Sequence, residues 1–133
     1  MIRWGRMLVY VWALPGTAVG IPAVLAAVLG GGTVRVVDGV LEVEGELVRR
    51  VLGWGFPWVG PVSAITLGHV VVGFDRVSLE RTRRHERVHV RQYERWGPFF
   101  IPAYVACSLV CRLRGRDPYR DNRFEREAYG EAG

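Results

Sequence analysis

The pattern of apolar and polar positions begins with an uncharged, mostly apolar run, Met7–Gly32, which follows Arg3 and Arg6 directly. A helix needs about 20 apolar residues to cross the hydrocarbon core of a bilayer, and this run is long enough. Pro15 and Pro22 interrupt the run. Transmembrane helices tolerate such residues when neighbouring groups satisfy the freed backbone. The run therefore predicts a membrane-embedded segment.

Two other interpretations of the run stay open. Met7–Leu14 has the length of the apolar part of a cleaved signal peptide, and the whole run is also compatible with a buried helix pair of a soluble fold. We expect residues 1–32 to form an apolar N-terminal membrane segment and residues 33–133 to form one folded domain. Basic residues before the run favour a cytoplasmic N-terminus if the run crosses once, whereas a helical hairpin would keep the domain inside.

Alternating apolar and polar residues follow, on either side of Asp38 and Gly39. An Asp-Gly pair between alternating runs is a strong signal for a hairpin with a two-residue turn. The alternation places Glu42, Glu44 and Glu46 on one polar face, which we expect to point outward.

An aromatic, glycine-rich and proline-rich stretch, Gly53–Pro61, predicts an ordered loop with exposed aromatic side chains. Such a loop either packs into the core or dips into a membrane interface, where tryptophan is favoured. The β-branched stretch Ala64–Val72 then predicts a single strand.

Three helices are predicted in the rest of the chain. Leu79–Trp96 ends at Gly97-Pro98, which is a typical helix stop, and the mostly apolar Phe99–Arg114 ends at Gly115. A last short helix is expected to begin at Asn122 and to run to about Tyr129. The order of strands and helices predicts an α+β fold.

Composition adds few constraints. The chain has a net charge of +5, and all its basic residues are arginines. This charge suits an anionic lipid headgroup or a nucleic acid, but the acidic residues among the arginines and the lack of a nucleic-acid motif argue against nucleic acid. Two cysteines exclude a disulfide-stapled scaffold, and we expect Cys107 and Cys111 to be small core residues.

The motif that carries chemistry is His85-Glu86-Arg87-Val88-His89, an H-E-x-x-H sequence inside the first of the three helices. Residues four apart lie one turn above each other, so two imidazoles can bind one zinc ion. Glu86 would take the proton of a water that the metal makes acidic, which is the arrangement of metal-assisted hydrolysis. The alternative is a basic surface helix whose histidines merely pack.

A catalytic zinc needs a third protein ligand. At 1.5 Å per residue, the second helix returns past the metal, and the following loop can span the overshoot. The last helix then passes near the metal and offers Glu125 and Glu127. For Glu125, a capping box with Asn122 is the competing interpretation.

These residues resemble the gluzincin metallopeptidases, in particular the minimal gluzincins and small membrane-bound bacterial relatives. The resemblance rests on His85–His89 and on Glu125-x-x-Ala128, and it covers about half of the chain. It implies a small zincin-like domain, Zn²⁺ held by His85, His89 and Glu125, and an edge strand at Ala64–Val72 that binds a peptide. The membrane-bound relatives have an aspartate after E-x-x-A, which braces a ligand histidine. Here that position is Tyr129.

Several other residues are candidates for supporting roles. Gln92, one turn beyond His89, is expected to brace the motif helix, and Tyr129 is the candidate brace for a ligand histidine. His69 is expected to be a local hydrogen-bonding residue and not a ligand. Three tyrosines could donate to an oxyanion, and the sequence does not rank them: Tyr93, Tyr104 and Tyr119.

The sequence thus predicts a membrane-associated zinc metallopeptidase that cuts a peptide or protein substrate with Glu86 as its base. The alternative is a non-catalytic, membrane-bound binding or scaffold protein with the same fold. We expect membrane lipid as a partner, no nucleic acid, and a location at the bacterial inner membrane. The run Gly97–Cys111 is not expected to span, because His85 and Glu125 would then lie on opposite sides.

Overall fold

The computed structural model describes residues 4–54 and 62–132 and has an α+β fold with a four-stranded mixed sheet. The predicted loop Gly53–Pro61 lies outside the described residues except for its first two, which end a helix, and Arg3 lies outside them as well. The helices are α1 (Trp4–Trp12), α2 (Leu14–Leu29), α3 (Glu46–Trp54), α4 (Arg76–Trp96), α5 (Phe100–Leu113) and α6 (Arg123–Ala132), with a short 3₁₀ turn, η1 (Gly97–Phe99), before α5.

Two hairpins make up the sheet. The first joins β1 (Thr33–Val37) to β2 (Val40–Glu44) in antiparallel register. Its turn residues Asp38 and Gly39 both have positive φ, +51° and +78°, as a type I′ turn requires. The predicted hairpin is therefore confirmed.

The second hairpin corrects the prediction of a single strand over Ala64–Val72. The chain reverses at Gly68 and His69, so β3 (Ala64–Leu67) pairs antiparallel with β4 (Val70–Gly73). Gly68 has a φ of +63°, which a residue with a side chain rarely adopts. β4 also pairs in parallel with β2, across the α3 connection, which gives the order β1-β2-β4-β3 and places β3 at an edge.

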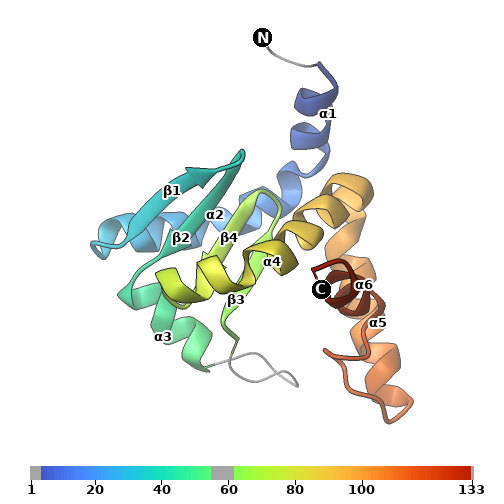
Figure 1. Cartoon of the computed structure of the whole chain (residues 1–133). Coiled ribbons are helices and arrows are strands. Elements are labelled where there is room, and N and C mark those ends of the chain that lie inside the picture. The colour runs from blue at the N-terminus through green and yellow to red at the C-terminus, as the bar shows by residue number, and fades with distance from the viewer. Residues whose placement is uncertain (1–3, 55–61, 133) are drawn as a thin grey trace.

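Helices cover both faces of this sheet (Figure 1). α4 lies on one face, where Leu79 and Val90 pack against Val40 and Val71. α2 and α3 lie on the other face, over a core that includes Val43. Alternate side chains along each strand thus pack into two separate cores, one on each face of the sheet.

The three predicted C-terminal helices are present. α4 begins at Arg76, three residues earlier than predicted, and is capped by Asp75, whose carboxylate accepts from the Ser78 amide at 2.7 Å. Gly97 ends α4 with a φ of +57° and turns the chain into α5. Asn122 precedes α6, and its side-chain oxygen accepts from the Phe124 amide at 2.9 Å.

The apolar run Met7–Gly32 forms α1 and α2, which meet at 67°. α2 packs directly on the sheet through two buried glycines. A Cβ atom on Gly16 would lie 2.5 Å from the Tyr93 ring, and one on Gly20 would lie 3.0 Å from the Val70 side chain. These positions therefore need glycine for close approach.

Length and apolar composition also allow a membrane location. Within the described residues, the helical stretch Arg76–Leu113 contains a segment that is long and apolar enough to cross a membrane, and only 17% of that segment is buried. α1 and α2 pass the same test only if the bent pair is taken as one span.

Glu42 corrects the prediction of an outward polar face. Its side chain is 1% exposed and points at α4, where two nitrogens of Arg83 donate to its two oxygens at 2.8 Å. Arg87 adds a third bond at 3.1 Å. The hydrogen bond from Arg83, supported by the charges of both arginines, lowers the pKa of Glu42 below its ordinary value. Glu44 is half-buried and Glu46 begins α3.

We expect Glu42→Gln to lower the free energy of unfolding by on the order of 3 kcal/mol, because it leaves buried arginine charge without its carboxylate. Chemical unfolding followed by tryptophan fluorescence measures this. Since folding lowers the pKa of Glu42, its stabilisation is present above the ordinary value of 4.5 and is lost as the pH falls through the folded-state pKa.

The matched control for this substitution is Glu46→Gln. Glu46 pairs with Arg50 at 3.5 Å on the surface, and both side chains are more than half exposed. Glu46→Gln should lower the free energy of unfolding by less than about 1 kcal/mol. Equal effects of the two substitutions would show that the Glu42 cluster adds nothing beyond a surface ion pair.

Candidate metal centre

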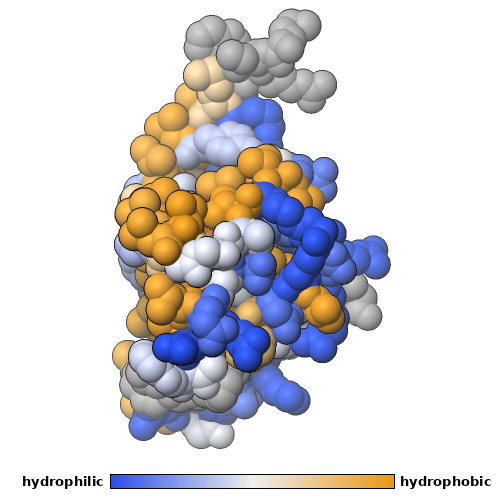
Figure 2. Space-filling model, turned by 90° about the vertical axis from the view of Figure 1, so that its left-hand side faces the viewer, coloured by the Kyte–Doolittle hydropathy of each residue, from blue (hydrophilic) through white to orange (hydrophobic). Residues whose placement is uncertain are grey.

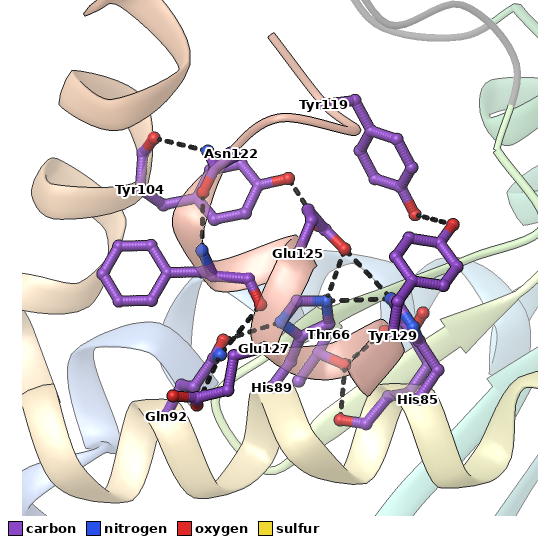
Figure 3. A network of polar contacts seen from close by, with 12 residues as sticks. Thr66, His85, His89, Gln92, Tyr104, Tyr119, Asn122, Glu125, Glu127 and Tyr129 are labelled. Carbon is purple, nitrogen blue, oxygen red and sulfur yellow. Dashed lines mark hydrogen bonds and ion pairs between the residues drawn. The ribbon is translucent and has the colours of Figure 1, made fainter. Parts of the chain in front are cut away.

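Two turns of α4 and the first turn of α6 bring three ligand atoms together (Figure 3). The Nε2 atoms of His85 and His89 lie 3.2 Å apart, and Oε1 of Glu125 lies 3.0 Å from each. All three side chains are largely buried. The structure therefore brings together the three residues that the sequence nominated as ligands.

This triangle has the size of one face of a metal tetrahedron. A zinc ion with ligand bonds of about 2.0–2.1 Å holds its ligand atoms about 3.3 Å apart. Two imidazole nitrogens and one carboxylate oxygen also form a donor set typical of catalytic zinc sites, which leave a fourth position open. The cluster could thus hold a metal ion of this kind.

The position of α6 depends on Asn122, the chain's one asparagine, which is fully buried. Its amide nitrogen donates to the Tyr104 carbonyl at 3.1 Å and to Ser108 Oγ at 2.9 Å, both on α5. Because Asn122 also caps α6, it fixes the start of α6 on α5. Glu125, on the first turn, is thereby aimed at the histidines, whereas Glu127 bonds to Gln92 and lies outside the ligand cluster.

Gln92 sets the tautomer of His89. Its amide nitrogen donates to the Phe124 carbonyl and to Glu127 Oε1, both at 3.0 Å. With both N–H donors used, its oxygen faces Nδ1 of His89 at 2.8 Å and accepts from it. A neutral His89 with the proton on Nδ1 presents the lone pair of Nε2 to the cluster, as a metal ligand must.

Glu125 is oriented through its second oxygen. Tyr104 donates to Oε2 at 2.6 Å, which leaves Oε1 to the histidines. Burial alone raises the pKa of Glu125, but hydrogen bonds from His85 and His89 outweigh burial and lower it to about 2. Burial alone lowers the pKa of His89, but Glu125 outweighs burial and raises it to about 9. The cluster thus favours positive charge at its centre, supplied by protons or by a metal ion.

Glu86 stands beside the ligands and outside their triangle. Its side chain is 5% exposed, and Oε2 accepts from Thr66 Oγ1 of β3 at 2.6 Å. Burial raises the pKa of this carboxyl. Sequence analysis missed Thr66, although a hydroxyl in an otherwise apolar strand was the available signal.

A cavity of about 600 Å³ opens over the cluster. Its walls come from α2, β3, α4, α5 and the loop before α6, and they are mostly apolar. The polar side chains at its base include Thr66, Glu86, His89 and Glu125. The candidate base and two of the candidate ligands therefore share one cavity with the edge strand.

The structure separates the three candidate tyrosines. The Tyr93 hydroxyl donates to the Thr66 carbonyl at 3.1 Å, and that of Tyr104 donates to Glu125. The Tyr119 hydroxyl lies 3.1 Å from that of Tyr129, and Tyr119 lines the cavity. Tyr129 meets His85 through its ring, with centroids 4.4 Å apart, while its hydroxyl faces Tyr119.

The remaining candidates lie away from the ligands. His69 is buried in the turn between β3 and β4, where Nε2 bonds to Glu94 at 2.7 Å and the ring stacks on Tyr10. His69 thus forms a hydrogen bond, as the sequence predicted, but its partner lies on α4 and is not a neighbour in the chain. Cys107 and Cys111 are free and half-buried on α5.

No protein-family model, curated protein or solved structure matches this chain.

If the cluster binds added zinc, we expect Gln92→Met to weaken that binding by about 10–100-fold, because the candidate ligand His89 loses the acceptor that fixes its tautomer. Competition with a chromogenic chelator measures the affinity, and circular dichroism checks the fold. The control is Arg91→Met on the neighbouring position, where the side chain is 57% exposed and pairs with Glu131. Unchanged zinc affinity in Gln92→Met would contradict this role.

Proposed function

We propose that this protein is a zinc-dependent metallopeptidase that acts at a membrane. The observation that carries the proposal is the buried triangle of His85, His89 and Glu125, of which His89 and Glu125 line one cavity together with the carboxylate of Glu86. Two histidines and a glutamate fit zinc, and the adjacent free carboxylate fits a general base.

When bound there, zinc lowers the pKa of a water molecule to about 7 and polarises a carbonyl group. Thr66 holds one oxygen of Glu86 at 2.6 Å, which fixes the rotamer of the carboxylate. Glu86 takes the proton of the attacking water and later passes it to the leaving amine. Tyr104 and Gln92 keep the ligand atoms in place while this occurs.

The edge strand supports a peptide as the substrate. β3 pairs on one side with β4, and its residues from Ala64 to Leu67 line the cavity above Glu86. An extended peptide can add to such an edge by backbone hydrogen bonds, which binds many sequences in one orientation. The scissile carbonyl would then lie over the ligand cluster.

Tyr119 is the best-placed donor for the carbonyl oxygen of the substrate. Tyr93 and Tyr104 already donate to protein acceptors, whereas the hydroxyl of Tyr119 contacts, within the described residues, the hydroxyl of Tyr129. Tyr119 also lines the cavity. A hydroxyl donor there would stabilise the negative charge that develops on the carbonyl oxygen.

We expect Glu86→Gln to retain zinc and to lose hydrolysis by about 10²–10⁴-fold, because the amide keeps the shape of the side chain but is not a base. Glu125→Gln should instead lose zinc, because an amide oxygen is a poorer ligand than a carboxylate. Elemental analysis of both purified variants and turnover of a peptide library by the wild type test the pair.

The outcome of this comparison separates the competing functions. A wild type that holds no zinc after supplementation excludes the enzyme. A wild type that holds zinc and cuts no peptide favours a non-catalytic binding or scaffold protein. Loss of zinc in Glu86→Gln with retention in Glu125→Gln would reverse the two assignments.

Tyr119→Phe should lower kcat by about 10²–10³-fold with little change in KM, since the donor acts on charge that develops only in the transition state. Tyr10→Phe is the control, because that hydroxyl donates to the Gly39 carbonyl and Tyr10 is not among the residues that line the cavity. An unchanged kcat in Tyr119→Phe would remove this residue from the chemistry.

A further inference from the structure

We infer that the protein lies in one leaflet of a membrane on a single apolar face, built from the outer sides of α2 and α5, and that neither helix crosses the bilayer. This lipid-docking face is defined by Ile21, Leu25 and Val28 on α2 and by Val105, Leu109 and Val110 on α5. All six side chains are more than 40% exposed. The inference deepens the membrane part of the proposed function and rests on it.

The outer side of α2 lacks the polar residues of an ordinary surface helix. Its buried positions Gly16, Gly20 and Ala27 recur along one side, and the exposed positions between them are uncharged and mostly apolar. A helix on the surface of a soluble protein turns polar residues outward. α2 is apolar on both sides, so water is an unfavourable neighbour for its outer side.

α5 repeats this pattern over its exposed stripe. Pro102, Val105, Leu109 and Leu113 follow one another at helical spacing and are exposed. The opposite side of α5 carries Tyr104 and Ser108, which face the metal centre and Asn122. The exposed stripe therefore has no partner within the described residues.

The cavity beside the cluster is lined by both α2 and α5. Val19 of α2, which is outside the lipid-docking face, and Val105 of α5, which belongs to it, are each 54% exposed. Figure 1 shows α2 and α5 receding behind α4 and α6. In Figure 2, apolar residues gather toward the α2 side, and hydrophilic residues gather on the α4 side. The apolar side of α2 thus lies across the sheet from the charged helix α4 (Figure 1 and Figure 2).

Packing argues against a spanning α2. Gly16 and Gly20 press α2 onto Tyr93 and Val70, so a spanning α2 would draw β3 and β4 into the hydrocarbon. The edge of β3 would then expose backbone groups that find no hydrogen-bond partner in lipid. A helix that lies in the membrane plane buries its outer side and leaves the sheet in water.

The length of α5 and the charges that follow it also favour an in-plane arrangement. The helical stretch Arg76–Leu113 has the length and composition to cross, but α5, its apolar end, has 14 residues and is about 21 Å long, which is shorter than a hydrocarbon core of about 30 Å. Arg114 and Arg116 follow α5 at exposed positions. With the net charge of +5, they suit anionic headgroups at the border of the face. The occupant of the face is therefore one leaflet that contains anionic lipid.

Flotation with preformed vesicles tests this face. The full chain, diluted from mild detergent into 3:1 phosphatidylcholine–phosphatidylglycerol vesicles, should float with the lipid in the presence of high salt. Leu25→Glu/Val28→Glu and Leu109→Glu/Val110→Glu should each reduce the bound fraction at least about tenfold, because each places two charges in the apolar region. The control is Val77→Glu on α4, an apolar residue 67% exposed on the opposite side, which should float as the wild type does.

Cysteine labelling tests whether the chain spans. In a Cys107→Ser/Cys111→Ser background, Gly5→Cys marks the first turn of α1 and Val36→Cys marks β1, which follows α2. Gly5 has open space around it and Val36 is 72% exposed. In sealed vesicles, a membrane-impermeant maleimide should label both or neither. Labelling of one alone would overturn the in-plane arrangement.

Three results separate this inference from the proposed enzyme. A protein that binds zinc but does not float overturns the docking face and leaves the enzyme standing. A protein that floats without binding zinc overturns the enzyme and leaves the docking face standing. A wild type that sediments as a dimer without lipid, becomes monomeric in Leu25→Glu/Val28→Glu and does not float would assign the face to a second copy of the chain.

Discussion

Three electron-rich atoms held within 3.2 Å of one another are the constraint on which the rest of this structure depends. Two of them are on α4, and the third comes from a helix that begins more than thirty residues later. Such a cluster does not assemble by itself, because its members repel unless a cation or a proton lies between them. The fold therefore has to hold α4 and α6 firmly from outside the cluster.

It does so on each side of α4. Toward the sheet, Arg83 and Arg87 hold Glu42 of β2, and the Glu86 carboxylate accepts from Thr66 of β3. Toward α6, Gln92 joins the His89 ring to the Phe124 carbonyl. One helix thus carries both the structural ion pairs and the two candidate ligand histidines, at positions separated by its own periodicity. A buried ion pair is weak evidence for stability in general, but here it sets the rotation of the helix that presents the histidines.

Sequence patterns predicted a feature correctly wherever that feature depends only on residues close together in the chain. Asp38-Gly39 determined its turn, Gly97 ended its helix, and the spacing of His85 and His89 put both on one side of α4. Glu125 could also be nominated as a ligand, because the lengths of α5 and of the loop after it limit where the chain returns to α4. Glu42 could not be placed in this way: alternation assigns it to one of two faces, and only the packing of α4 shows that its face is buried against arginines. The turn between β3 and β4 was missed because strand-forming residues continue on both sides of Gly68 and His69, so that the whole stretch resembles one strand.

The glycine contact between α2 and the motif helix has a geometric consequence. Gly16 leaves no side chain between the α2 backbone and Tyr93, which is on the same helix as the histidines. Any surface that holds α2 therefore holds the ligand cluster at a fixed height above it, without an intervening hinge. In the proposed peptidase, this height would determine which bond of a substrate reaches Glu86, and the identity of the neighbouring side chains would be secondary.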